Sequence, residues 1–168
     1  MGYSSTASAA PYKTTLMLTL VALVLSATVA YFLFPYVRHL YIDTPVWTAQ
    51  AEDDCDLHQA ACRVAVPNGW VELSLAPNPI ELLTPLTLTV TLEGYTPEQL
   101  HVDLSSPDMY MGFNRPELLP TGLPGEFQGV TALGVCVLET MMWEAKVLLP
   151  VAGGMGEVSF TFSTTRNF

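Results

Sequence analysis

The clearest pattern in the sequence is one long apolar run near its start. Residues 16–34 (LMLTLVALVLSATVAYFLF) are almost all apolar, and residues 14–37 contain no charged side chain. As a helix, residues 16–34 span about 28 Å, close to the thickness of a bilayer's hydrocarbon core. The run predicts a transmembrane helix over residues 14–37 that ends or kinks at Pro35. A cleaved signal peptide is the alternative, although its apolar core is usually only about 7–15 residues long.

After residue 62 apolar positions alternate with polar ones, the pattern of a strand with one buried face. The alternation is clearest over residues 86–92, 100–104 and 157–162, and prolines and glycines separate the runs. Seven or eight short strands in about 105 residues predict an antiparallel, immunoglobulin-like β-sandwich over residues 63–168. The predicted core residues are Leu88, Val90, Val102, Trp143, Val147, Phe160 and Phe162.

The segment between the apolar run and the strands, residues 38–62, has no sustained periodicity and predicts a stalk. Its acidic residues and His58 are interpreted as solvated side chains. Cys55 and Cys62 are close enough in sequence for a disulfide if the chain turns between them. Such bonds persist in oxidising compartments, which favours a domain outside the cytoplasm.

Charge and motifs exclude several classes of function. The 168 residues carry 16 carboxylates and 6 basic side chains, for a net charge of −10. Because the basic residues are scattered singly, they form no patch for nucleic acid. The sequence has no glycine-rich phosphate loop, GxSxG or HExxH motif, and no nucleophile with its base, so we expect no enzyme. All the carboxylates follow residue 42, which favours a cytoplasmic amino terminus (residues 1–13) and an extracytoplasmic domain.

Sulfur-containing side chains gather in two short segments. Met109 and Met111 lie two residues apart, and Cys136 is followed by Met141 and Met142. Once the other two cysteines pair, Cys136 keeps a free thiol. Thiolate and thioether donors together favour Cu(I). The sequence therefore predicts a Cu(I) site with the donors Cys136, Met109, Met111 and Met142.

A packing role is the alternative for this sulfur cluster. Methionine fills irregular cores, and an unpaired cysteine is often a small buried hydrophobe. Adjacent Met141 and Met142 point to opposite faces of a regular strand, so at most one of them faces a common site. Asp108, beside Met109, is interpreted either as a group that supports a ligand or as a turn cap.

The order of these segments resembles a family of small membrane proteins. One apolar helix is followed by LTLTVTLEG, MYMGFNRPEL, GEFQG, a cysteine-containing strand and MMWEAKVLL. This order is similar to that of the FixH and YtkA-like families. The resemblance implies a single-pass protein of the bacterial inner membrane with a periplasmic immunoglobulin-like domain, linked to assembly of copper-containing respiratory oxidases. The matching residues are Met109, Met111, Gly112, Asn114, Cys136, Met142 and Trp143.

Two functions are therefore expected, both with membrane protein partners. The first is a copper-handling accessory factor that binds Cu(I) and acts with subunits or assembly factors of a respiratory oxidase. The second is a structural accessory subunit of a membrane complex, without metal. Small residues at Ala22, Ser26 and Ala30 recur every four positions, a pattern that allows a partner helix to pack closely in either case.

Overall fold

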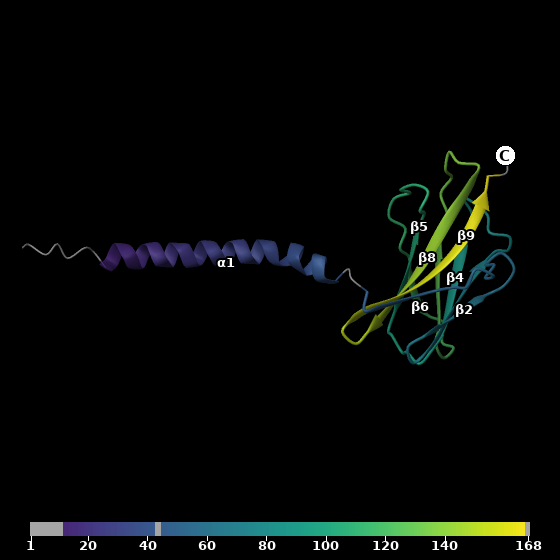
Figure 1. Cartoon of the computed structure of the whole chain (residues 1–168), viewed down its shortest axis with the longest axis horizontal. Helices are drawn as coiled ribbons and strands as arrows, with labels where there is room; N and C mark the ends of the chain where they lie inside the picture. The colour runs from purple at the N-terminus through teal and green to yellow at the C-terminus, as the bar shows by residue number, and fades with distance from the viewer. Residues whose placement is uncertain (1–11, 43–44, 167–168) are drawn as a thin grey trace, which may run out of the picture. The chain divides into compact units, whose positions relative to one another are not determined.

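The structure is a computed structural model that describes residues 12–42 and 45–166, with side chains described over 15–34 and 45–166. The chain divides into two compact units, residues 1–44 and 45–168. The first contains a helix and the second a β-domain (Figure 1). The predicted combination of one apolar helix with a mostly β domain is therefore confirmed.

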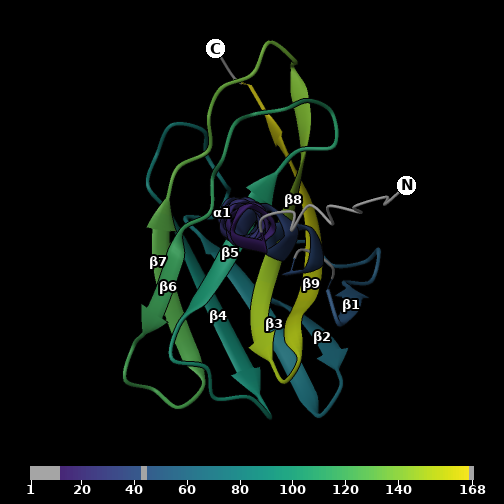
Figure 2. The same ribbon diagram turned by 90° about the vertical axis from the view of Figure 1, so that its left-hand side faces the viewer.

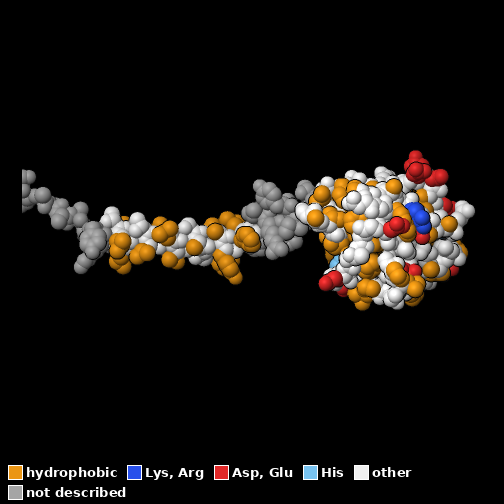
Figure 3. Space-filling view, turned by 90° about the horizontal axis from the view of Figure 1, so that it is seen from below, with side chains coloured by type: hydrophobic (Ala, Val, Ile, Leu, Met, Phe, Trp, Pro, Cys, Tyr) orange, Lys and Arg blue, Asp and Glu red, His pale blue; other side chains and the backbone are white. Residues whose placement is uncertain are grey.

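The first unit contains helix α1 (Tyr12–Ile42). Its stretch Thr15–Phe34 is long and apolar enough to cross a membrane, and its side chains are exposed (Figure 3). The hydroxyls of Thr19, Ser26 and Thr28 donate to backbone carbonyls three or four residues earlier. The polar groups of these side chains are thus satisfied within the helix, as an apolar environment requires.

Helix α1 extends beyond the predicted range at both ends and continues through Pro35. Of the two predicted effects of Pro35, an end or a kink of the helix, the end is wrong, because α1 continues to Ile42. Proline removes one backbone hydrogen bond from a helix, but the turns on either side keep theirs, so the helix can continue. Of the predicted cytoplasmic segment 1–13, residues 1–11 lie outside the described residues.

Over residues 45–166 the second unit forms nine strands. Strands β4, β5, β8 and β9 alternate buried and more exposed residues, as the sequence predicted. All seven predicted core residues are buried. The strands are β1 (Trp47–Gln50), β2 (Cys62–Val66), β3 (Gly69–Ala76), β4 (Leu86–Glu93), β5 (Leu100–Ser105), β6 (Glu117–Pro120), β7 (Glu126–Thr131), β8 (Thr140–Val151) and β9 (Gly154–Thr165).

The nine strands form one continuous sheet in the order β1-β9-β8-β5-β6-β7-β4-β3-β2. The short strand β6 pairs with β5 through its first half and with β7 through its second, so it joins two groups of strands (Figure 2). Strands β1 and β2, at the two ends of this order, contact each other, and the sheet is nearly closed into a barrel. Because β1 runs parallel to β9, the sheet is mixed, and the prediction of antiparallel pairing is wrong at this pair.

Strand β1 lies where the sequence predicted a stalk. Trp47 pairs with Gly156 of β9, and the Ala51 N–H donates to the Ser159 carbonyl at 2.9 Å. The Trp47 ring occupies the space that a side chain at position 156 would need, so a glycine there lets β1 dock. Residues 45–62 therefore belong to the folded domain, and the predicted boundary at residue 63 is corrected to Pro45.

The loop between β1 and β2 is closed by the predicted disulfide. Cys55 and Cys62 are bonded, with their Cα atoms 5.7 Å apart. Between them, Leu57 is buried in the core. The pKa of Asp56 is lowered because the Gln59 side chain and the His58 backbone N–H both donate hydrogen bonds to its carboxylate.

His58 in this loop is not the solvated side chain that the sequence suggested. Its Nε2 lies 2.6 Å from the Ser163 carbonyl, and its Nδ1 accepts a hydrogen bond from the Ile80 N–H at 3.4 Å. These partners assign the ring hydrogen to Nε2. The half-buried ring thereby joins the disulfide loop to β9 and to the segment after β3.

We expect loss of the Cys55–Cys62 bond to lower the free energy of unfolding by about 2–3 kcal/mol, because the bond restricts the unfolded chain. Denaturant unfolding of the full chain in detergent, followed by tryptophan fluorescence, measures the loss in a Cys55→Ala, Cys62→Ala double variant. A reductant should destabilise the native protein by the same amount and leave the double variant unchanged. Equal sensitivity of both proteins to the reductant would contradict this role.

Candidate metal-binding site

Two loops at one end of the β-domain carry the sulfur-containing residues that the sequence singled out. The methionine loop, residues 106–116, connects β5 to β6, and the cysteine loop, residues 132–139, connects β7 to β8. Both lie at the end of the domain where β9 finishes (Figures 1 and 2). Strand β1 pairs near the start of β9, so the two loops lie at the opposite end from the point where the chain joins the sheet.

Asn114 fastens the methionine loop to the beginning of the cysteine loop. Its side-chain N–H donates to the Ala132 carbonyl at 3.1 Å, and its side-chain oxygen accepts from the Thr131 hydroxyl at 2.7 Å. The Asn114 backbone carbonyl also accepts from the Leu104 N–H of β5 at 2.8 Å. One side chain therefore holds the last residues of the methionine loop beside the end of β7.

Asp108 fastens the methionine loop to the far end of the cysteine loop. Its Oδ2 accepts a hydrogen bond from the backbone N–H of Met142, near the start of β8, at 2.8 Å. The Asp108 backbone N–H donates to the Ser106 hydroxyl at 3.2 Å within its own loop. The carboxylate thus links two segments rather than capping its own turn, and the methionine loop is tied to the start of the cysteine loop and to the strand that follows it.

The sulfur atoms of Cys136 and Met109 are in direct contact between these two ties. The Cys136 thiol donates to the Met109 thioether with the sulfurs 2.7 Å apart, and the Leu138 N–H lies 3.5 Å from the same thiol. Cys136 is 9% exposed and Met109 is 38% exposed. The structure therefore brings two of the four predicted donors together, with the cysteine sheltered and the methionine at the surface.

Met111 lies against the cysteine loop, directly before a sharp turn of the chain. Gly112, the next residue, has φ of +84°, a conformation that favours glycine. The Met111 side chain packs on the edge of the core, and its terminal methyl is 3.5 Å from the position that a Cβ at Gly134 would take. Met111 is thus close to the cysteine loop but is partly used in packing.

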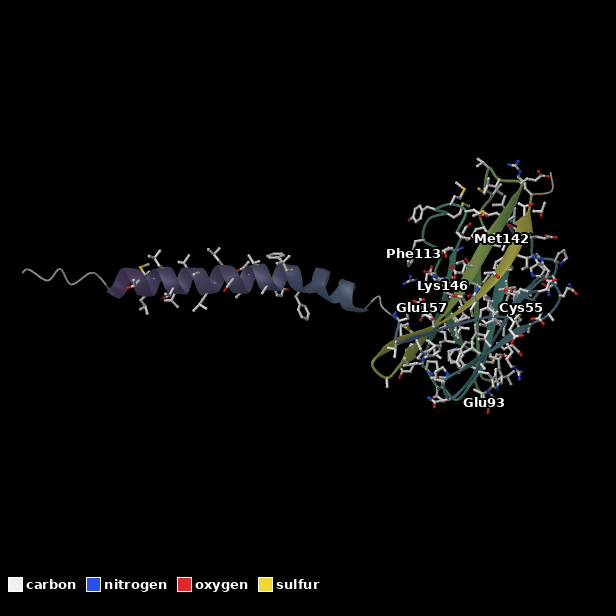
Figure 4. The ribbon with its side chains drawn as sticks, in the orientation of Figure 1. Cys55, Glu93, Phe113, Met142, Lys146 and Glu157 are labelled. Carbon is white, nitrogen blue, oxygen red and sulfur yellow. A yellow bond between two sulfur atoms is a disulfide. The ribbon has the colours of Figure 1, made fainter. Side chains whose placement is uncertain are left out.

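The two methionines at the start of β8 have different surroundings, as the alternation of a strand predicts. Met141 is buried in the core at 3% exposure, and Met142 is 41% exposed on the outer face (Figure 4). Met142 is joined to the methionine loop through its backbone bond to Asp108. Met141 is therefore a core residue, and of the pair only Met142 has an accessible side chain.

Arg166 holds the cysteine loop from the end of β9, a contact that sequence reasoning missed. Its guanidinium donates to the Cys136 carbonyl at 3.3 Å, and its backbone N–H donates to the Glu139 carbonyl at 2.8 Å. No motif marks this residue, because an arginine near the end of a strand is common on protein surfaces. The contact follows from where β9 ends, which only the folded sheet shows.

The two loops that carry the sulfur pair also carry exposed apolar side chains. Tyr110 and Phe113 in the methionine loop are 88% and 76% exposed, and Val137 in the cysteine loop is 79% exposed. The Arg115 guanidinium lies over the Phe113 ring, 5.0 Å from its centre, while bonding to Asp103 at 2.8 Å. Large exposed apolar side chains of this kind are common on surfaces that meet a partner.

Comparisons with known proteins give no information about the site, so the support for it comes from its own residues. No protein-family model, no curated protein and no solved structure matches the chain. The resemblance to the FixH and YtkA-like families therefore stays a prediction. Among the described residues, no three histidine, cysteine or acidic side chains are grouped to hold a metal ion, and the sulfur pair is the candidate site.

We expect Asn114→Ala to lower the free energy of unfolding by about 1–2 kcal/mol, because two side-chain hydrogen bonds between the loops are lost. Denaturant unfolding of the full chain in detergent measures the change. Gln99→Ala, which shortens an exposed amide just before β5, is the matched control and should have little effect. If Asn114→Ala is as stable as this control, Asn114 does not hold the two loops together.

Proposed function

We propose that this protein is a copper-handling accessory factor that binds one Cu(I) ion through the Cys136 thiolate and the Met109 thioether. Met111 and Met142 are proposed as further donors. The observation that supports this function is the direct contact of two soft sulfur donors from separate loops. Thiolate and thioether sulfur favour Cu(I) over harder ions. Because the thiol must lose its proton to become a ligand, one proton is released for each ion bound.

The surroundings of the sulfur pair suit an ion that is held and then passed on. The Cys136 thiolate is the strong donor and is sheltered, and the Met109 thioether is a weaker donor at the surface. A carrier must release its ion to a tighter site, which weak thioether ligands favour. Exposed Tyr110, Phe113 and Val137 supply an apolar surface for the partner that exchanges the ion. The proposed partners are subunits or assembly factors of a respiratory oxidase.

For the scaffold, we propose a relationship to the immunoglobulin-like sandwich. Two groups of strands, β1-β9-β8-β5 and β7-β4-β3-β2, are joined through the short strand β6. Their buried residues form a single hydrophobic core, as the two inner faces of a sandwich do. In such scaffolds the loops at one end commonly carry the function.

We also propose that α1 crosses the bacterial inner membrane once and is retained, with residues 45–168 in the periplasm. Three observations support this placement. The stretch Thr15–Phe34 is long and apolar enough to span a bilayer. The Cys55–Cys62 disulfide belongs in an oxidising compartment. All 16 carboxylates follow residue 42, and 15 of them make the β-domain, residues 45–168, strongly acidic.

A structural accessory subunit without metal is the second candidate function. Met111 and Cys136 both pack at the edge of the core, so part of the sulfur cluster already has a structural use. The same exposed apolar side chains would then cover a partner subunit without exchanging an ion. The two functions differ in whether Cys136 binds Cu(I).

The proposed placement predicts that reporters fused after Phe168 are active only when exported. An export-dependent phosphatase fused there should be active, and a cytoplasm-only fluorescent reporter should be dark. The same fusions on a chain lacking residues 14–37 are the control and should show the reverse. Native protein extracted from membranes should have the mass of the whole chain, 18.3 kDa. A bright cytoplasmic reporter, or a shorter mass that lacks the helix, would contradict the placement.

The proposed metal site predicts near-stoichiometric Cu(I) binding by the full chain in detergent. The measurement is an anaerobic titration against a competing Cu(I) chelator, with the disulfide left intact. Cys136→Ser should abolish the binding, because the thiolate is the strongest soft donor of the site. Met109→Leu should weaken it, because an apolar side chain of similar size replaces the thioether.

Met155→Leu is the matched control for the titration, since it removes a thioether from β9, outside the two loops. This variant should bind Cu(I) as the native protein does. Equally negligible binding by the native protein and by Cys136→Ser would reject the copper function and favour the structural subunit.

A further inference from the structure

The bond between Asp108 and Met142 lies where the sheet loses a strand. Strand β5 pairs with β8 as far as Ser105, opposite Glu144, and the chain then leaves the sheet as the methionine loop. Two residues before Glu144 on β8, the Met142 N–H donates to the Asp108 carboxylate. A side chain thus supplies the acceptor beyond the point where the β5 backbone stops pairing. The Met142 end of the bond is fixed in the sheet, because Met142 also pairs with Ser163 of β9.

This bond lies one residue away from the sulfur contact. Asp108 precedes Met109, whose thioether touches the Cys136 thiol. The two sulfurs are already in contact, so an ion that binds to both requires them to separate. A reagent that approaches the sheltered thiol from this side meets the same thioether. The movement of Met109 is limited by the backbone beside it, which the Asp108 bond ties to β8.

We infer that Asp108 is a positioning residue that holds Met109 over Cys136 and keeps the site closed when no metal is bound. The inference rests on the proposed function where it concerns Cu(I), but the closing of the thiol is a property of the metal-free protein. Asn114 ties the other end of the same loop, several residues from Met109. When the bond between Asp108 and Met142 breaks, Met109 can move and expose Cys136, while Asn114 still holds the other end of the loop.

The test measures how fast Cys136 reacts with N-ethylmaleimide in the metal-free full chain in detergent, with the Cys55–Cys62 disulfide intact. Asp108→Ala should raise the rate by about fivefold or more, the factor expected for the loss of one hydrogen bond. Asp108→Asn should react at close to the native rate, because its amide oxygen still accepts from the Met142 N–H. Equal acceleration in both variants would overturn the inference, because the cause would then be the lost negative charge.

A second measurement needs no variant. Hydrogen exchange followed by NMR should show the Met142 amide of the native protein protected, since its N–H is bonded to Asp108. Exchange at the rate of a free amide would overturn the inference even if Asp108→Ala does not fold.

A third measurement separates the inference from the proposed function. If the native protein binds Cu(I), Asp108→Ala should take up the ion about fivefold faster than Asp108→Asn. If the native protein binds Cu(I), but Asp108→Ala and Asp108→Asn have equal uptake rates and equal alkylation rates, the role of Asp108 is rejected and the copper function stands. No Cu(I) binding by the native protein, together with faster alkylation of Asp108→Ala alone, would reject the copper function and keep the closing role.

Discussion

The long antiparallel ladder between β8 and β9 is the constraint on which the rest of the domain depends. The two strands pair along their whole length, from Thr140 opposite Thr165 to Val151 opposite Gly154. Their inward side chains, with Trp143 and Phe160 among the largest, fill the core. Strand β5 attaches to one side of this ladder and β1 to the other. Because β8 begins directly after the cysteine loop, the ladder also determines where that loop is held.

The candidate site forms where backbone pairing stops and side chains replace it. Asp108 bonds to β8 beyond the end of β5, Asn114 bonds across to the end of β7, and Arg166 holds the cysteine loop beyond β9. These polar contacts position a pair of soft sulfur atoms that bond only weakly themselves. The same loops leave Tyr110 and Phe113 exposed, which a stable isolated domain does not need. Two loops that the scaffold holds in place, with apolar side chains exposed to a partner, are compatible with both proposed functions.

The wrong predictions for the predicted stalk, residues 38–62, have a common physical cause. Strand β1 is four residues long, too short for a periodic pattern, and its partner β9 lies about a hundred residues away in the chain. From local pattern alone the segment therefore predicts a stalk and a solvated His58, although the His58 ring bonds to Ser163 and Ile80. The end of the helix predicted as one effect of Pro35 fails for a separate, local reason, because the turns on either side of the proline maintain the helix.

The sequence by itself determined the apolar helix, the alternating strands, the core residues and the disulfide pair, because each depends on local spacing and side-chain type. It also identified Met109 and Cys136, since soft donors are rare and stand out by composition. Only the tertiary structure decided the strand order, the contact between those two sulfurs and the bonds of Asp108, Asn114 and Arg166. Each joins segments far apart in the chain, and their approach depends on how the whole sheet pairs and packs rather than on any local pattern.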